Sequence, residues 1–279
     1  MFIFFSKYIY FILCIHNYIK PFSNILLYNM DSTIISIIMA GGLGKRMSAT
    51  KSKVLHNVNG FPMIYHVIQN ALAVHSERIF IVVGKYKYDI ADAVGKLFSK
   101  EILDKIVYVN QPESILEGEL RSLGTGDAVR ACLTEFDNYD FRPDTRILIL
   151  SGDVPFINRT EILEFSKHNN SIMVANVNDP TGYGRIFINE HGNLSYIVEH
   201  ALCDKEQLKC TFVNAGIYNL SMQLLRETIP KIELNTHKME FLLTDFYLFT
   251  DRPIHIFFTS GVPKNVNTLT DLLHVQSEN

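Results

Sequence analysis

Three glycines and two cations follow an apolar, isoleucine-rich run near the start of the chain. Gly41, Gly42 and Gly44 lack the side chains that would keep the backbone away from a nucleotide. Their N–H groups can therefore form a concave nest for phosphate oxygens. Arg46 and Lys53 come next, as fixed cations of the kind that phosphoryl chemistry requires. Residues of these types at this spacing predict a phosphate-binding loop.

The spacing excludes two other glycine loops. Gly42 and Gly44 fit the first half of the dinucleotide fingerprint G-x-G-x-x-G, but Met47 stands where the third glycine belongs. A P-loop needs G-x-x-x-x-G-K-[ST], and residues 44–46 lack both that spacing and the hydroxyl. One alternative stays open for the loop alone, a plain strand-to-helix turn that carries two surface cations.

A carboxylate closes a later apolar run at residues 146–150. Ser151 and Gly152 turn the chain there, and Asp153 follows. Mg2+ prefers oxygen donors and is usually shared between one or two protein groups and substrate phosphates. We therefore expect Asp153 to bind Mg2+; the alternative is a helix N-cap before Pro155.

Alternating strand and helix patterns position these groups. Up to residue 150 they predict a mostly parallel sheet with right-handed crossovers and helices on both faces. Ligands of such sheets bind beyond the carboxyl ends of the strands, where the glycine loop and Asp153 both lie. The expected strands are residues 34–39, 78–84, 105–110 and 146–150, and the expected helices are residues 62–72, 88–98 and 127–136.

From residue 171 onward the pattern changes to that of an antiparallel β insertion against the main sheet. The fold class is therefore α/β, a Rossmann-like sheet with an antiparallel segment, in one domain at residues 31–279. Its expected strands are residues 172–177, 181–188, 194–199, 212–220 and 253–258, and its expected helices are residues 240–250 and 269–275.

The composition is that of an ordinary globular protein, with 279 residues of which 47% are apolar and 20% charged. The net charge of −3 argues against a nucleic-acid or anionic-membrane surface, which needs clustered Lys and Arg. The four cysteines show no C-x-x-C spacing, so neither a zinc site nor a disulfide framework is expected. Cys203 and Cys210 are near enough to face each other in a hairpin, but reduced thiols in a cytoplasmic protein are the expectation.

Residues 1–30 form an apolar N-terminal extension. Lys7, Asn17 and Lys20 interrupt it, whereas a spanning helix needs about 20 uninterrupted apolar residues. It also lacks the small-residue cleavage site of a signal peptide. Three interpretations stay open: a weak membrane anchor, an extension of the domain, and a misassigned start with Met30 as the true one. We favour the last, and expect membrane contact only if residues 1–30 are expressed.

The loop pattern G-G-x-G-x-R-M, followed by a lysine before Val-Leu, resembles the sugar-nucleotide pyrophosphorylases. Its ending at residues 53–56 looks most like the UDP-N-acetylglucosamine branch. The resemblance runs from about Ser36 to about Asn267. It implies a nucleotide-diphospho-sugar transferase fold, Mg2+ as cofactor, and UTP and N-acetylglucosamine 1-phosphate as substrates. It covers no acetyltransferase half of the kind that bacterial relatives carry, and it leaves the oligomeric state open.

The resemblance also implies the catalytic roles. Arg46 would hold the β- and γ-phosphates that leave, and Lys53 would bridge the α-phosphate and the incoming sugar phosphate. Asp153 would share Mg2+ with an asparagine near the end of the domain, which Asn267 matches. Asn265 is a near alternative, and a turn-forming asparagine is a second interpretation of either.

The sequence L-G-T-G at residues 123–126 resembles the motif that grips the uracil base together with an upstream glutamine, here Gln111. Two departures from the family occur. Residues 112–122 form an insertion, which either covers the base pocket or shifts Gln111 away from it, and Asp127 replaces the usual histidine. The implied nucleotide-binding residues are Met39, Ala40, Gly41, Gly42, Gln111, Gly124, Thr125, Ser151 and Gly152.

Four residues match the family's sugar-binding positions, namely Gly184, Glu199, Asn214 and Thr244. A pocket built to hydrogen-bond hydroxyls rejects analogues that lack them, so neutral sugars need such donors and acceptors. Each segment taken singly is also compatible with a strand or hairpin end. Three rivals remain: the same fold with another sugar 1-phosphate or nucleotide, a catalytically silent regulatory relative, and a glycosyltransferase, whose D-x-D motif is absent here.

Overall fold

The computed structural model describes residues 33–44, 47, 50–116, 118–261, 265, 266, 268 and 270–273. The chain separates into two units, residues 1–31 and residues 32–279, and the description concerns the second. The predicted N-terminal extension at residues 1–30 lies outside the described residues. Within the described part of the chain, no helix is both long enough and apolar enough to cross a membrane.

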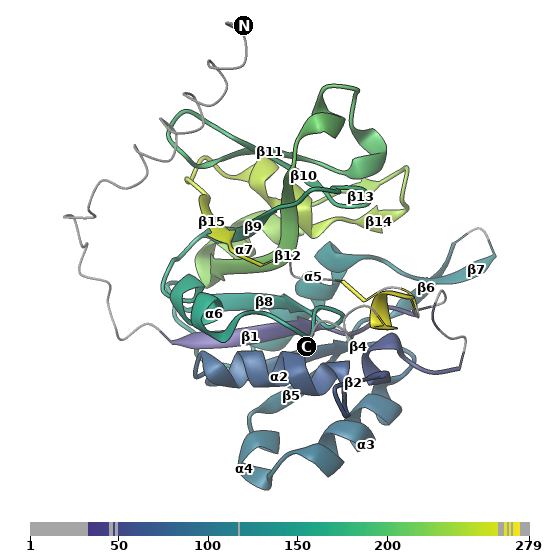
Figure 1. Ribbon diagram of the computed structural model, residues 1–279. Coiled ribbons are helices and arrows are strands. Elements are labelled where there is room, and N and C mark those ends of the chain that lie inside the picture. Colours follow the sequence, from purple (N-terminus) through teal and green to yellow (C-terminus); the bar gives the residue numbers. More distant parts are fainter. Residues whose placement is uncertain are drawn as a thin grey trace, which may run out of the picture. The chain divides into compact units, whose positions relative to one another are not determined.

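Four parallel strands form the first half of the sheet (Figure 1). β1 lies in the middle, paired with β4 on one side and β8 on the other, and β5 pairs with β4. These strands and the helices between them confirm the predicted mostly parallel arrangement. Their bounds are β1 Ile34–Met39, α2 Met63–Ala73, β4 Ile79–Val83, α3 Lys87–Leu97, α4 Lys100–Leu103, β5 Ile106–Asn110, α5 Thr125–Phe136 and β8 Arg146–Ser151.

Alternating side chains of these strands build a core on each face of the sheet. Ile35 and Ile37 of β1 belong to the cluster that contains the apolar face of α5. Ile38 belongs to the cluster that contains the buried residues of α2 and α3. Successive residues of a strand point to opposite faces, so a continuous apolar run serves both clusters.

The second half of the sheet is mainly antiparallel and is centred on the long strand β12. β12 pairs antiparallel with β8, β9 and β10, while β15 runs parallel to β9. The predicted antiparallel insertion is therefore present, and the nine strands form one continuous sheet. The bounds are β9 Ser171–Asn176, β10 Arg185–Ile188, β11 Leu194–Val198, β12 Phe212–Ser221 and β15 His255–Thr259.

The predicted helix at residues 240–250 is present only from residue 243, as a 3-10 helix, and its first part is wrong. Glu240–Phe241 is the short strand β14, which pairs with β13 (Leu234–Asn235), and Leu243–Phe249 is a 3-10 helix, η5. The Phe241 N–H donates to the Leu123 carbonyl (2.7 Å), so a distant loop holds this backbone extended against its helical spacing. The predicted helix at residues 269–275 is described only at residues 270–273, which are helical.

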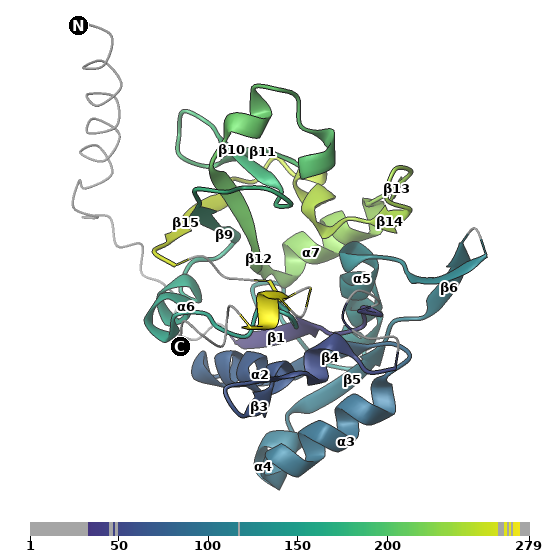
Figure 2. The ribbon, with the colours of Figure 1, turned by 45° about the vertical axis from the view of Figure 1, so that its right-hand side comes forward.

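Several short elements were not predicted. α6 and α7 both begin at polar caps, since Asn158 accepts from the Thr160 N–H and Ser221 accepts from the Leu224 N–H. The insertion at residues 112–122 forms a hairpin, β6 and β7, which extends away from the sheet in both views (Figures 1 and 2). The remaining bounds are η1 Lys53–Leu55, β2 Asn57–Val58, β3 Phe61–Pro62, β6 Glu113–Leu116, β7 Glu119–Ser122, α6 Arg159–Phe165, η2 His200–Leu202, η3 Gln207–Lys209, α7 Met222–Thr228 and η4 Ile229–Lys231.

Candidate active site

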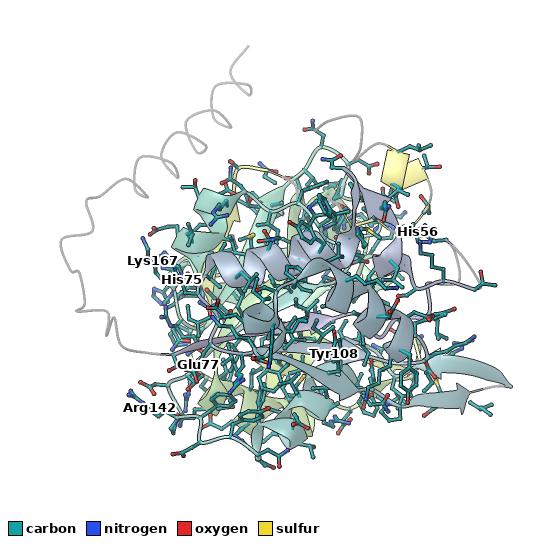
Figure 3. All side chains as sticks on the ribbon, turned by 90° about the horizontal axis from the view of Figure 1, so that it is seen from below. His56, His75, Glu77, Tyr108, Arg142 and Lys167 are labelled. Atoms are coloured by element: carbon teal, nitrogen blue, oxygen red, sulfur yellow. The ribbon has the colours of Figure 1, made fainter. Side chains whose placement is uncertain are left out.

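The carboxyl ends of the parallel strands meet at one edge of the sheet. Met39 is in register with Val82 and with Ser151, and the Gln111 N–H donates to the Val83 carbonyl (2.7 Å) just beyond β5. Figure 3 shows His56, which follows η1, far from His75, which lies between α2 and the amino end of β4. The pairing order therefore brings the glycine loop, Gln111 and Ser151 to the same edge.

A cavity of about 610 Å³ opens at this edge. Its lining comes from β1, the glycine loop, η1, the end of β5, β7, the first turn of α5, the end of β8, β14 and residue 265. Ala40 and Gly152 do not line it, and both are buried. The predicted residues that do line it are Met39, Gly41, Gly42, Lys53, Gln111, Gly124, Thr125, Ser151 and Asp153.

Gly152 supports the cavity wall from behind. A Cβ at this position would lie 2.8 Å from the Met39 carbonyl oxygen and 3.0 Å from Cγ1 of Val54. Only glycine lets the turn after β8 pack this closely against β1 and η1. Val54 and Leu55 are buried, so the same contact fixes the segment that begins with Lys53.

Lys53 and Asp153 form an ion pair inside the cavity. The Lys53 Nζ contacts Oδ2 of Asp153, and the Ser151 hydroxyl donates to Oδ1 (2.6 Å). Asp153 is only 5% exposed, so its charge is compensated by these two groups. Arg46, the other predicted cation, lies outside the described residues.

Two oxygen donors suited to a hard cation line the same cavity. The Val266 N–H donates to the Asp153 carbonyl (2.9 Å), which brings the segment at residues 265–266 against Asp153. Oδ1 of Asn265 is buried without a hydrogen-bond partner among the described residues. A carboxylate and an amide oxygen fit the donor preference of Mg2+. Asn267, the predicted second ligand, lies outside the described residues.

Gln111 stays at the cavity despite the insertion that follows it. It is 3% exposed, and its Nε2 donates to the Gly124 carbonyl (2.9 Å) and to Oδ2 of Asp127 (3.0 Å). The Ser122 hydroxyl at the end of the hairpin donates to Oε1 of Gln111 (3.2 Å). Of the two effects considered for the insertion, displacement of Gln111 is therefore not the one observed.

The turn that opens α5 is locked against β14. Gly124 has φ +96°, and a Cβ there would lie 2.7 Å from the Phe241 carbonyl oxygen. The Leu243 N–H donates to the Thr125 hydroxyl oxygen (3.0 Å). The amino end of α5 thus faces the cavity, where its N–H groups favour carbonyl or anionic oxygens.

The four predicted sugar-binding residues come together in a group that we call the Glu199 cluster: Gly184, Glu199, Asn214 and Thr244. The Thr244 hydroxyl donates to Oε1 of Glu199 (3.2 Å), and the Asn214 N–H donates to the Gly184 carbonyl (2.9 Å). A Cβ on Gly184 would lie 3.5 Å from Oε1 of Glu199 and 3.9 Å from Cβ of Asn214. None of the four is among the described residues that line the cavity.

Acidic groups connect the Glu199 cluster to the cavity. Lys238 Nζ pairs with Oε2 of Glu199 (2.8 Å), and Glu240 lines the cavity. Burial raises the pKa of Glu240, with Lys238 opposing the rise and Glu199 adding to it. Burial likewise raises the pKa of Asp245, with Glu199 adding to the rise. Lys238 therefore offsets the charge of several neighbouring carboxylates.

Some residues at the site were not predicted from the sequence. Arg121 and Ser122 line the cavity from the inserted hairpin, and Ala128 lines it from the first turn of α5. Ala128 could in principle have been predicted from the sequence, because a small residue one turn into a helix permits close approach of a ligand. Arg121, Ser122 and Lys238 lie in segments without a recognisable motif, so only the fold brings them to the site.

Comparison with known proteins finds a matching family and similar proteins. Residues 35–246 match the nucleotidyl transferase family. A probable UDP-N-acetylglucosamine pyrophosphorylase of Acanthamoeba polyphaga mimivirus is 31% identical over 265 residues, which cover 89% of this chain and 97% of that protein. The bifunctional protein GlmU of Picosynechococcus sp. is 34% identical over 221 residues, 77% of this chain but only 45% of GlmU.

A solved structure shares the fold. The crystal structure of UDP-glucose pyrophosphorylase complexed with UDP-glucose superposes with a TM-score of 0.66 at 16% identity, covering 88% of this chain and 98% of that one. At this level of identity the likeness concerns the fold alone. It agrees with a Rossmann-like sheet extended by antiparallel strands.

Proposed function

The chain belongs to the nucleotidyl transferase family, and on that premise we propose that it transfers a uridylyl group from UTP to N-acetylglucosamine 1-phosphate. The products are UDP-N-acetylglucosamine and pyrophosphate. Free thiols at Cys132, Cys203 and Cys210 are compatible with a reducing compartment, and we propose the cytoplasm.

In the proposed reaction a phosphate oxygen of the sugar 1-phosphate attacks the α-phosphorus of UTP. The bond from that phosphorus to the bridging oxygen breaks, and pyrophosphate leaves with the electron pair. The attacking oxygen is already anionic near neutral pH, so no general base is required. No histidine is among the described residues that line the cavity, which is compatible with this chemistry.

Positioning and charge neutralisation are then the tasks of the protein. Lys53 is proposed to hold the α-phosphate and the incoming phosphate, and Arg46 the departing phosphates. The ion pair of Lys53 with Asp153 in the cavity supports this proposal, because it holds the ammonium beside the proposed metal ligand.

Asp153 and Asn267 are the proposed holders of Mg2+, with Asn265 as the neighbouring alternative that lines the cavity. When bound, Mg2+ would neutralise charge on the triphosphate and polarise the α-phosphate. The Asp153 carboxylate accepts from Lys53 and from Ser151 and has further lone pairs, so it could hold the metal beside the lysine.

Recognition of the two substrates is assigned to the two ends of the site. Gln111 and the Gly124–Thr125 turn are proposed to hold the uracil, beside the phosphate-binding glycines. The Glu199 cluster is proposed to hold the sugar, because its carboxylate, amide and hydroxyl groups provide the donors and acceptors that neutral hydroxyls require.

The observation that carries the proposal is the convergence of Lys53, Asp153 and Gln111 on one cavity at the carboxyl edge of the sheet. The test is pyrophosphate release with Mg2+, measured for UTP, dTTP, CTP, ATP and GTP against the 1-phosphates of N-acetylglucosamine, glucose and mannose. The full chain and a chain that starts at Met30 are assayed in parallel. We expect the highest kcat/KM for UTP with N-acetylglucosamine 1-phosphate.

Each other outcome selects a rival. Preference for another pair of substrates retains the reaction and replaces the specificity. Absence of pyrophosphate release from every pair, in protein that still binds a nucleotide sugar, identifies a regulatory relative and overturns the proposal.

A further inference from the structure

The side-chain amide of Gln111 has a fixed orientation. Its Nε2 lies 2.9 Å from the Gly124 carbonyl oxygen and 3.0 Å from Oδ2 of Asp127, and both of these groups only accept hydrogen bonds. At the other end of the amide, Oε1 accepts from the Ser122 hydroxyl (3.2 Å). Rotation of the amide by half a turn would set Oε1 against a carbonyl and a carboxylate, neither of which can donate to it, and would leave Nε2 only the Ser122 hydroxyl oxygen as an acceptor.

This orientation decides which atom of Gln111 faces a ligand. Both hydrogens of Nε2 are engaged, so Nε2 has no donor left for a base. Oε1 has a second lone pair and lies over Gly41, where a Cβ would be only 2.8 Å away. Gly41 and Gln111 both line the cavity, so the group presented there is an acceptor.

We propose that Asp127 is a positioning residue for base selection: its carboxylate holds the Gln111 amide so that only bases with a ring N–H are accepted. This inference rests on the proposed function, and deepens it. Uracil and thymine carry a hydrogen on N3 and can donate it to Oε1. Cytosine carries a lone pair on N3, which would face the lone pair of Oε1.

Asp127 is better suited to this task than a neutral residue would be. A carboxylate has no donor, so it cannot stabilise the reversed amide. It also forms a charge-assisted hydrogen bond with Nε2, which is stronger than a neutral one. The position is the third residue of α5, where an aspartate also interacts favourably with the helix dipole. The experiment must separate these two roles.

The test compares kcat/KM for UTP and for CTP, with N-acetylglucosamine 1-phosphate, in wild type and in Asp127→Asn. The asparagine amide can donate to Oε1, so the reversed orientation of Gln111 becomes accessible. We expect the UTP-to-CTP ratio to fall by about tenfold, the effect of losing about one good hydrogen bond. Asp89→Asn is the matched control, because Asp89 is also the third residue of its helix, α3, and lies away from the cavity.

A role in helix stability alone would lower activity with both nucleotides equally and leave the ratio within about twofold of wild type, which overturns the inference. Ser122→Ala gives a second test outside α5, since it removes the donor that holds Oε1; a fall of the ratio by about threefold is expected. An unchanged ratio in this variant also counts against the inference.

Calorimetric binding of UTP and CTP separates this inference from the proposed function. Suppose that the wild-type protein releases no pyrophosphate but binds UTP better than CTP, and that Asp127→Asn reduces this preference. The inference about Asp127 then holds, and the proposed reaction is overturned. If the enzyme is active and the substitution changes neither the UTP-to-CTP ratio of binding constants nor that of kcat/KM, only the inference about Asp127 is overturned.

Discussion

The cavity and the Glu199 cluster are built differently. Around the cavity, short contiguous stretches supply backbone groups and glycines, and the packing is tight: a Cβ on Gly152 would lie 2.8 Å from a backbone oxygen. In the Glu199 cluster four separate segments meet: the Thr244 hydroxyl donates to the Glu199 carboxylate, and the backbone N–H of Asn214 donates to the Gly184 carbonyl. There a Cβ on Gly184 would make only ordinary contact, at 3.5 Å.

This difference suggests a division of tasks. A nucleoside triphosphate needs many fixed N–H groups and charges, which a rigid backbone provides. A sugar needs alternating donors and acceptors, which side chains such as those of Glu199 and Thr244 provide. Substitutions at the cavity should therefore affect every substrate, whereas substitutions in the Glu199 cluster should affect the sugar phosphate alone.

The largest effect is expected at the two predicted catalytic cations. Lys53→Ala should lower turnover by about 10² or more, since it removes a preorganised charge from the reacting phosphates. Arg46→Ala should do the same. Lys96→Ala is the control, because this lysine is 73% exposed and pairs with Asp92 on α3. A decrease of less than about threefold in steady-state pyrophosphate release would contradict the role of the lysine.

Glycine substitutions test the difference in packing. Gly152→Ala should lower the free energy of unfolding by about 1–3 kcal/mol, because the new methyl group meets backbone that cannot move freely. Gly184→Ala should change it by less than about 0.5 kcal/mol. Urea unfolding of both variants checks the comparison, and equal destabilisation of the two would break it.

Glu199→Gln tests whether the cluster acts on the sugar phosphate alone. The glutamine side chain has one acceptor oxygen where the glutamate carboxylate has two. KM for the sugar 1-phosphate should therefore rise by about tenfold, the effect of one impaired hydrogen bond to a charged group. KM for UTP should stay within about twofold. Glu206→Gln is the control, since Glu206 is exposed and pairs with Lys209. A parallel rise in both KM values would mean that the two regions are not independent.

The smallest effect concerns Glu240, which lies between the two regions. Burial raises its pKa above the ordinary 4.5, so the ionised form is disfavoured in the folded state. Its contribution to stability is fully present below pH 4.5 and is lost as the pH rises through the raised pKa. Glu240→Gln should therefore melt about 1–2 °C above wild type at pH 8, and the difference should vanish toward pH 4. A difference that is independent of pH would contradict this assignment.

The same contrast explains what the sequence could predict. The strands around the cavity and the turns at residues 41–44 and 123–126 are specified by neighbouring residues, so their types and spacing were sufficient. The helix predicted at residues 240–250 begins only at Leu243, because the Phe241 backbone pairs with Leu123, a partner far away in the sequence. No local pattern contains such a contact.

The members of the Glu199 cluster were predicted only through the resemblance to the family, supported by their order and spacing along the chain. Nothing near Lys238 indicates that it pairs with Glu199, and nothing near Ser122 indicates that it donates to Gln111. Contacts between side chains on separate loops depend on the completed fold. Asn267 and Arg46 stay predictions, because both lie outside the described residues.

The hydrogen bond from the Val266 N–H to the Asp153 carbonyl has a consequence for synthesis of the protein. A ribosome makes the chain from its amino end, so Lys53 in η1 and Asp153 after β8 emerge long before residues 265 and 266. The sheet can begin to form while the last wall of the active site is still untranslated. Competence for catalysis should therefore be among the last properties that the nascent chain acquires.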